Sequence, residues 1–383
     1  MLSRRELVIA AVGWSVIGVG CGVPGATAVP TVVTPPTSTV APSPTTLPVV
    51  AATVTAGSAP TPLAKPTSAA PTVVPPVAST APPVASVAAK PSGGGGFNWS
   101  GKWTSKSAVP TPRSELGAAA IGMKAYLIGG FAPDRSRVHE EYDAATDRWR
   151  SRASVPVACD HPGVAAVGGK IYLVGGYGAG GPLDIAVEYD PAADVWRALP
   201  PMPSRRGALA LGVIDGKIYA VGGVSQGGTA ANEVFDPITE KWQALRPMPT
   251  PRDHLAVAAV GGKLFAIGGR SDNMARNLDA NEEYDPARDV WTVKRKLPTA
   301  RSGIAADVLR GRIHVFGGET TGKTFSENEE YDPAADAWAS RASMPTARHG
   351  LAAVTMGDAI YVMTGGPTPD GSQIGSNEMY SPG

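Results

Sequence analysis

The chain has almost no cysteine, because Cys21 and Cys159 are the only two in 383 residues. Two cysteines in different regions cannot build a disulfide framework, and they exclude a zinc site made of cysteine thiolates. The chain also lacks an excess of either charge, since its formal net charge is +1. Nucleic-acid binding depends mainly on neutralising phosphates with basic side chains, so we expect no nucleic-acid partner.

Residues 29–92 lack aromatic residues and carboxylates, and their only charges are Lys65 and Lys90. The segment consists almost entirely of Pro, Thr, Ala, Val and Ser. It buries too little apolar surface to offset its conformational entropy, and frequent proline favours extended polyproline II. We therefore expect residues 29–96 to be a disordered Pro/Thr/Ala-rich stalk that ends in the flexible joint Gly93–Gly96.

The N-terminus has the layout of an export signal, a short basic start followed by an apolar run over 7–19. That run is shorter than the roughly 20 residues that a membrane-spanning helix needs. Ala26-Thr27-Ala28 predicts cleavage after Ala28, whereas 17–21 resembles a bacterial lipobox with Cys21 as the lipidated residue. Arg4-Arg5 either resembles a twin-arginine export motif or is simply the charged start of the signal. We expect residues 1–28 to direct the protein out of the cytoplasm, as a secreted or surface-anchored protein.

The remaining residues, 97–383, contain six glycine pairs at nearly constant intervals of 46 to 49 residues. The pairs begin at Gly129, Gly175, Gly222, Gly268, Gly317 and Gly365. Each pair follows a short aliphatic and aromatic run, such as 171–174, which predicts a strand that ends at the glycines. A Tyr or Phe follows each pair, and in five repeats a tryptophan comes seven residues after it, as in Tyr142 and Trp149.

Each repeat therefore predicts four antiparallel strands, which we name a to d in chain order, with the tryptophan on strand d. Radial repetition of such units makes a propeller, so six repeats predict an all-β, six-bladed β-propeller. The last repeat ends at Gly383 before any tryptophan, whereas Trp103 precedes the first repeat. We expect the N-terminal strand with Trp103 to complete the last blade, which would close the ring and remove an exposed sheet edge.

The glycine pair, the tyrosine, the tryptophan and the Pro-Met-Pro steps at 201–203 and 247–249 resemble the Kelch repeat. The resemblance covers residues 101–383. It implies a propeller that uses arginine and other polar residues on one face to bind acidic peptide motifs. Bacterial members of this family also include periplasmic sugar mutarotases and copper-dependent galactose oxidases. Copper chemistry is not expected, because Cys159 is the only propeller cysteine and no histidine pair has ligand spacing.

The loops of one face vary more than those of the other. Strands alternate in direction, so the d-to-a and b-to-c loops share a face. The distance from the glycine pair to the next Tyr or Phe varies from 13 to 16 residues, whereas the c-to-d turn is constant. Variable loops in repeat proteins mark the binding face, so we expect a ligand there, the alternative being that these are tolerant surface loops.

An arginine stands 16 or 17 residues before five of the glycine pairs. These residues are Arg113, Arg206, Arg252, Arg301 and Arg348. A guanidinium group can form two hydrogen bonds to one carboxylate or phosphate, so this ring of arginines can recognise an anion. Strand c offers a structural alternative, because a glutamate that could pair with each arginine recurs two residues before the aromatic. These are Glu140, Glu233, Glu282, Glu329 and Glu378.

Residues that break the regularity are better candidates for specificity. We predict that five of them bind the ligand together with the arginines: His161, His254, Arg270, Glu319 and His349. Glu115, His161 and His254 could hold a metal near the axis, but satisfied surface histidines are the simpler interpretation, so we assign no metal, cofactor or catalytic residue.

The predicted function is a non-catalytic binding module, a monomeric propeller tethered outside the cytoplasm that recognises a protein or carbohydrate ligand, an acidic one included. It would meet a membrane only through an N-terminal anchor. The alternative is an extracytoplasmic sugar-acid mutarotase or epimerase-like enzyme, in which Glu319, His254 and the arginine ring supply acid, base and carboxylate grip. A shallow loop-lined face favours the module, and a deep axial pocket with an isolated carboxylate beside an arginine favours the enzyme.

Overall fold

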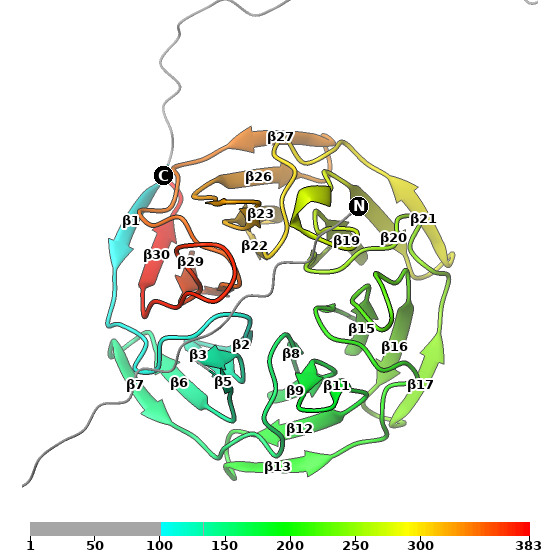
Figure 1. The fold of residues 1–383 in the computed structure, drawn as a ribbon, viewed down its shortest axis with the longest axis horizontal. Helices are drawn as coiled ribbons and strands as arrows, with labels where there is room; N and C mark the ends of the chain where they lie inside the picture. Colours follow the sequence, from blue (N-terminus) through cyan, green and yellow to red (C-terminus); the bar gives the residue numbers. More distant parts are fainter. Residues whose placement is uncertain (1–100, 133) are drawn as a thin grey trace, which may run out of the picture. The chain divides into compact units, whose positions relative to one another are not determined.

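The computed structural model describes residues 101–132 and 134–383, which form six four-stranded antiparallel sheets arranged around an axis (Figure 1). The predicted all-β, six-bladed propeller is confirmed. Within each blade the a strand lies nearest the axis and the d strand lies on the outer rim. The predicted signal, residues 1–28, and the predicted stalk, residues 29–96, lie outside the described residues.

Five blades are each built from one continuous segment, with the strands in chain order from the axis outward. Blade 1 contains β2 (Gly117–Ile121), β3 (Lys124–Ile128), β6 (His139–Asp143) and β7 (Arg148–Ser151). Blade 2 contains β8 (Gly163–Val167), β9 (Lys170–Val174), β12 (Ala186–Asp190) and β13 (Val195–Ala198). Blade 3 contains β14 (Ala210–Ile214), β15 (Lys217–Val221), β16 (Asn232–Asp236) and β17 (Lys241–Ala244). Blade 4 contains β18 (Ala256–Val260), β19 (Lys263–Ile267), β20 (Asn281–Asp285) and β21 (Val290–Val293). Blade 5 contains β22 (Ala305–Leu309), β23 (Arg312–Phe316), β26 (Asn328–Asp332) and β27 (Ala337–Ser340).

The sixth blade combines both ends of the propeller. Its strands are β28 (Ala352–Met356), β29 (Ala359–Met363), β30 (Asn377–Ser381) and, on the rim, β1 (Lys102–Ser105) (Figure 1). Trp103 of β1 pairs with Tyr380 of β30, and its indole Nε1 donates a hydrogen bond of 2.9 Å to the carbonyl oxygen of Ala342. The strand that carries Trp103 therefore occupies the position that the other blades fill with their own d strand.

The constant interval of seven residues reflects the c-to-d hairpin. Tyr142 and Trp149 lie directly opposite each other across β6 and β7, with ring centroids 4.9 Å apart. The tyrosine hydroxyl donates to the carboxylate of Asp147 in the turn at 2.6 Å, and Asp147 has a left-handed φ of 54°. The indole Nε1 donates to the carbonyl oxygen of Ser107, just after β1 of the sixth blade, at 2.9 Å. The tyrosine bond to the turn recurs at Tyr189, Tyr284 and Tyr331, and the indole bond to the neighbouring blade recurs at Trp196, Trp242, Trp291 and Trp338. These repeated contacts account for the constant length of the turn.

The b-to-c loops carry the extra structure that distinguishes one blade from another. These elements are the hairpins β4 (Phe131–Ala132) with β5 (Asp134–Arg135), β10 (Tyr177–Gly178) with β11 (Gly181–Pro182), and β24 (Glu319–Thr320) with β25 (Lys323–Thr324), and the short helix η1 (Met274–Arg276). Bridges such as Ser114 to Phe131 and Asp253 to Arg270 join the d-to-a loops to the b-to-c loops. The two kinds of loop therefore share one face. Within the described residues, no helix has the length and apolar character needed to cross a membrane.

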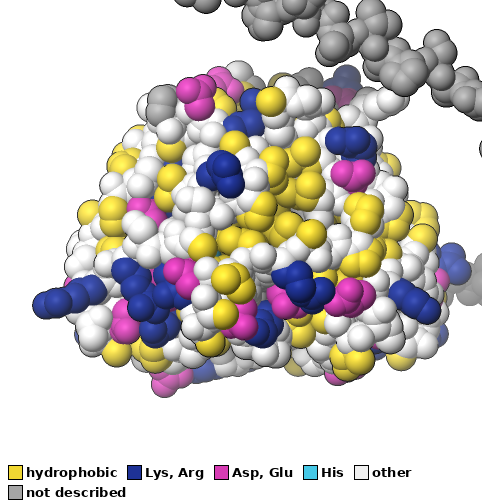
Figure 2. All heavy atoms as spheres, turned by 90° about the horizontal axis from the view of Figure 1, so that it is seen from below, with side chains coloured by type: hydrophobic (Ala, Val, Ile, Leu, Met, Phe, Trp, Pro, Cys, Tyr) yellow, Lys and Arg dark blue, Asp and Glu magenta, His cyan; other side chains and the backbone are white. Residues whose placement is uncertain are grey.

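One side of the propeller mixes both charge signs. Figure 2 shows lysine and arginine side chains beside aspartate and glutamate side chains along its lower edge, with hydrophobic side chains between and above them. This view agrees with the formal net charge of +1. It shows no surface of a single charge sign on this side of the molecule.

Candidate functional site

The five regularly spaced arginines lie inside the blades. Each side chain has an exposed fraction of 0% and pairs with the strand-c glutamate of its own blade. The pairs are Arg113–Glu140, Arg206–Glu233, Arg252–Glu282, Arg301–Glu329 and Arg348–Glu378. Other N–H groups donate to backbone carbonyls, as Arg252 does to Ala266 at 2.8 Å. The structure therefore places these arginines in the pairing that was the structural alternative, with guanidinium groups closed off from solvent.

Two residues after this position, the chain reaches the axis in every blade. The equivalent residues are Glu115, His161, Ala208, His254, Gly303 and Gly350, and all have a φ between 50° and 62°. Each backbone N–H donates to the carbonyl oxygen of the equivalent residue in the preceding blade at 2.7 to 3.0 Å, and Glu115 donates to Gly350. Six hydrogen bonds thus close a ring, which we call the axial ring. The ring holds four non-glycine residues in a conformation that L-residues rarely adopt.

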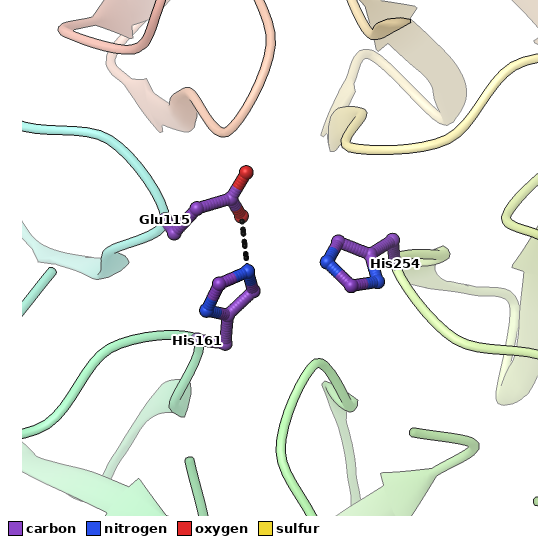
Figure 3. Close-up of side chains that lie close together, drawn as sticks. All are labelled: Glu115, His161 and His254. Atoms are coloured by element: carbon purple, nitrogen blue, oxygen red, sulfur yellow. Dashed lines mark ion pairs between the residues drawn. The ribbon is translucent and has the colours of Figure 1, made fainter. Parts of the chain in front are cut away.

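Three larger side chains extend from the axial ring toward one another. Figure 3 shows Glu115, His161 and His254 converging from three different loops. Glu115 Oε2 lies 3.2 Å from His161 Nε2, and the rings of His161 and His254 have centroids 4.9 Å apart. The other three ring positions are Ala208, Gly303 and Gly350, which carry only a methyl group or no side chain.

The three histidines of this face are oriented in the same way. Nδ1 of His161 bonds to the Asp160 carboxylate at 2.6 Å, and Nδ1 of His254 bonds to the Asp253 carboxylate at 2.5 Å. Nδ1 of His349 lies 3.1 Å from the carbonyl oxygen of Gly366. With Nδ1 occupied, Nε2 of each ring is the atom left to face the cavity.

Arg270 and Glu319 complete the polar wall. Arg270 donates to Glu319 Oε1 at 3.0 Å, to His254 Nε2 at 2.9 Å and to Asp253 Oδ1 at 3.3 Å. Nε2 of His349 lies 3.6 Å from Glu319 Oε2, and the Glu319 side chain is only 4% exposed. These contacts join irregular residues of blades 4, 5 and 6 in one network.

These residues line a cavity of about 310 Å³, which we call the axial mouth. Its wall consists of Ser114, Glu115, Phe131, His161, His254, Arg270, Glu319, His349, Asp370 and Gly371. Beneath it, the axial ring surrounds a narrower space of about 90 Å³, and the inner strands line a further space of about 140 Å³. The mouth is at the lower end of the size range of small-molecule sites.

The pKa values of Glu115 and Glu319 are shifted in opposite directions. Burial opposes ionisation of Glu115, but its electrostatic interactions with His161, His254, His349 and Arg270 outweigh it and lower its pKa to about 2. Burial raises the pKa of Glu319, and the charge of Glu115 adds to the effect against the opposing pull of His349 and Arg270. The mouth therefore combines a carboxylate that stays ionised with one that holds a proton more readily.

The ten residues predicted to bind the ligand lie in two places, five in the wall of the axial mouth and five arginines inside the blades. His161, His254, Arg270, Glu319 and His349 all line the axial mouth. Phe131 and Asp370 also line the mouth but were not predicted, since each lies in an irregular b-to-c loop without a repeated counterpart. Glu115 was predicted only as a metal candidate. Its signal was present in the sequence, because Glu115 stands two residues after Arg113 as His254 stands two after Arg252.

Comparison with known proteins agrees with the repeat pattern. The family model described as the KLHDC2/KLHL20/DRC7 Kelch-repeats domain matches residues 97–269, and the Kelch motif model matches residues 251–298. No curated protein matches the sequence. A solved structure titled "Structure of YjhT" is similar, with 18% identity, a TM-score of 0.63, and coverage of 71% of this chain and 95% of that chain. At this identity the likeness shows the fold alone.

Proposed function

The chain belongs to the Kelch-repeat propeller family, and on that premise we propose that it is a non-catalytic binding module. It recognises a protein or carbohydrate ligand through the face formed by the d-to-a and b-to-c loops. The signal pattern of residues 1–28 directs the protein out of the cytoplasm. The protein works there and is held in place by its N-terminal segment.

The observation that carries this proposal is the axial mouth. Polar side chains from separate blades converge on a cavity of about 310 Å³, whereas the regular arginines stay inside the blades. A cavity of this size accepts one sugar ring or one side chain of a bound protein. The remaining loops of the same face offer a wider surface around it for the rest of the ligand.

The charges of the mouth favour a hydroxyl-rich or cationic group over the acidic ligand that the arginine ring suggested. Three acidic residues line the cavity, Glu115, Glu319 and Asp370, together with one arginine, Arg270. The guanidinium of Arg270 is already paired with Glu319 and Asp253. A second anion would therefore meet more negative than positive charge, while hydroxyl groups could accept from Arg270 and donate to the carboxylates.

A ligand screen on the full chain tests this proposal. Neutral sugars, sugar acids, basic peptides and acidic peptides are added one by one, the unfolding temperature is measured, and hits are titrated by calorimetry. We expect at least one neutral-sugar or basic-peptide hit, whose affinity falls at least tenfold in E319Q and in R270Q. The matched control is I238S, because Ile238 is 94% exposed in the c-to-d turn of the opposite face. Equal loss in I238S, or no loss in the mouth variants, would assign the ligand to another surface.

One observation favours a second candidate, a sugar-acid mutarotase or epimerase-like enzyme. Such an enzyme needs an acid and a base on either side of a sugar ring. Glu115 and Glu319 share the mouth with pKa values displaced in opposite directions, an arrangement that suits an acid–base pair. Arg270 beside Glu319 could hold the carboxylate of a sugar acid.

Anomer exchange separates the two candidates. The rate at which the α and β forms of a sugar acid interconvert is followed by proton NMR with and without the full chain. The binding module predicts no acceleration over buffer. The enzyme predicts an acceleration that E319Q abolishes and that I238S leaves unchanged.

A further inference from the structure

We infer that Glu115, His161 and His254 form a binding site for one divalent transition-metal ion on the propeller axis. The three residues come from the axial loops of blades 1, 2 and 4, and one ligand atom of each lies within 4.8 Å of the other two (Figure 3). Metal–nitrogen bonds are about 2.0–2.1 Å long, so ligand atoms around a tetrahedral ion lie about 3.3 Å apart. Inward rotation of the side chains by about 1 Å would therefore close the site.

The neighbours of the two histidines support a metal rather than a chance cluster. Asp160 and Asp253, each directly preceding its histidine, accept a hydrogen bond from Nδ1. A carboxylate on Nδ1 fixes the tautomer in which Nε2 carries the free lone pair, and metal-binding histidines in proteins are usually held this way. The same device occurs twice, in two blades, with both Nε2 atoms directed at the axis.

The backbone supports the same conclusion. Glu115, His161 and His254 all have a left-handed φ, between 50° and 53°, and each is fixed by the hydrogen bonds of the axial ring. Ala208 at the equivalent position of blade 3 shows that the fold does not need a long side chain there. The ligand atoms therefore stand on a rigid frame, which is what a preorganised metal site requires.

Arg270 occupies the lone pair that a metal would use on His254. Its Nη2 lies 2.9 Å from His254 Nε2, while Nη1 and Nε are held by Glu319 and Asp253. Metal binding would break only the contact with His254, and the two carboxylates would retain the guanidinium. Arg270 therefore competes with the metal, and its removal should strengthen metal binding.

The donor set narrows the choice of ion. Two imidazole nitrogens and one carboxylate oxygen suit zinc, cobalt, nickel, manganese or iron as divalent ions, whereas magnesium and calcium prefer oxygen donors alone. Three protein ligands leave at least one position open toward the mouth. The inference does not depend on the proposed ligand, since metal binding can be measured without one.

The test is a titration of the full chain, produced without an affinity tag and stripped with a chelator, with Co²⁺ followed by visible absorption. We expect saturation at one Co²⁺ per chain, and displacement by Zn²⁺. E115Q, H161Q and H254Q should each weaken binding at least tenfold and change the cobalt spectrum at saturation. H314Q is the matched control, because His314 is buried in blade 5 beside Glu330. This variant should leave the Co²⁺ affinity and the cobalt spectrum unchanged.

Two further variants separate positioning from ligation. D160N should weaken Co²⁺ binding by about 10- to 100-fold without changing the spectrum at saturation, because the ligands themselves remain. R270Q should bind Co²⁺ at least as tightly as the unaltered chain. Circular dichroism and the unfolding temperature verify the fold of each variant. No saturable binding by the unaltered chain, or equal affinity in H161Q and H254Q with the fold intact, would overturn the inference.

Discussion

Trp103 and Tyr380 face each other across β1 and β30 with ring centroids 5.3 Å apart, although 277 positions separate them in the sequence. Trp103 also packs edge-on against Phe316 of blade 5 at 5.9 Å. The first strand of the propeller thus touches both the last blade and its neighbour. An outer strand in this position covers the edge of β30, which would otherwise be open for pairing with another chain.

Removal of this strand should destroy the cooperativity of the propeller. We expect deletion of residues 100–107 to broaden the thermal unfolding transition and to promote self-association, as followed by calorimetry and light scattering. W103A should lower the free energy of unfolding by about 3 kcal/mol, as large-to-small changes of aromatic side chains do. T104A, on the exposed face of the same strand, should change it by less than about 0.5 kcal/mol. Unaltered cooperativity in the deletion would mean that the strand does not hold the ring.

The buried Arg252–Glu282 pair should act as a structural unit. E282A leaves the Arg252 guanidinium buried without its carboxylate, so we expect a loss of about 3–5 kcal/mol in the free energy of unfolding. The double variant R252M/E282L, which removes both charges, should be less destabilised than E282A. Chemical denaturation measures both. If E282A were as stable as the unaltered chain but bound the ligand with a different affinity, these arginines would have a role in binding.

His139 should make stability depend on pH. Burial lowers its pKa from 6.5 to about 4, so the unfolded chain takes up a proton more readily than the folded one. The contribution of His139 to the free energy of unfolding is therefore fully present above pH 6.5. About 3 kcal/mol of it is lost as the pH falls toward 4. We expect H139F to show a smaller loss than the unaltered chain over this window in urea denaturation. If the free energy of unfolding fell equally with pH in both proteins, His139 would not be the source of the pH dependence.

A pair of glycines tests the geometry of the mouth. Gly350 and Gly303 both have a left-handed φ, 55° and 62°, so alanine at either should destabilise the fold by about 1 kcal/mol. A Cβ at Gly350 would lie 2.5 Å from Glu115 Oε1, whereas one at Gly303 would meet nothing closer than 3.4 Å. We therefore expect G350A, but not G303A, to weaken ligand or Co²⁺ binding in titrations. Equal effects on binding would show that the position of Glu115 does not matter.

The fold could be predicted because its signals are repeated. The interval from Tyr142 to Trp149 recurs as a consequence of one hairpin geometry, and the unpaired Trp103 indicated which strand lay outside its repeat. The site was harder to predict. Sequence spacing placed Arg113 near Glu140 but could not show that the pair points into the blade, since the direction of a loop side chain depends on local φ and ψ. The contact of Arg270 with His254 and Glu319 joins three separate loops, and no local pattern encodes it.

The five histidines allow the most direct test of the axial mouth as the functional site. His161, His254 and His349 line the mouth, whereas His139 and His314 are buried in blades 1 and 5. Side-chain ¹H–¹⁵N correlation spectra of the full chain are recorded while a ligand from the screen is added. The account predicts that the three mouth histidines shift in a saturable manner and that the other two stay in place. Saturable binding that moves none of the three would contradict it.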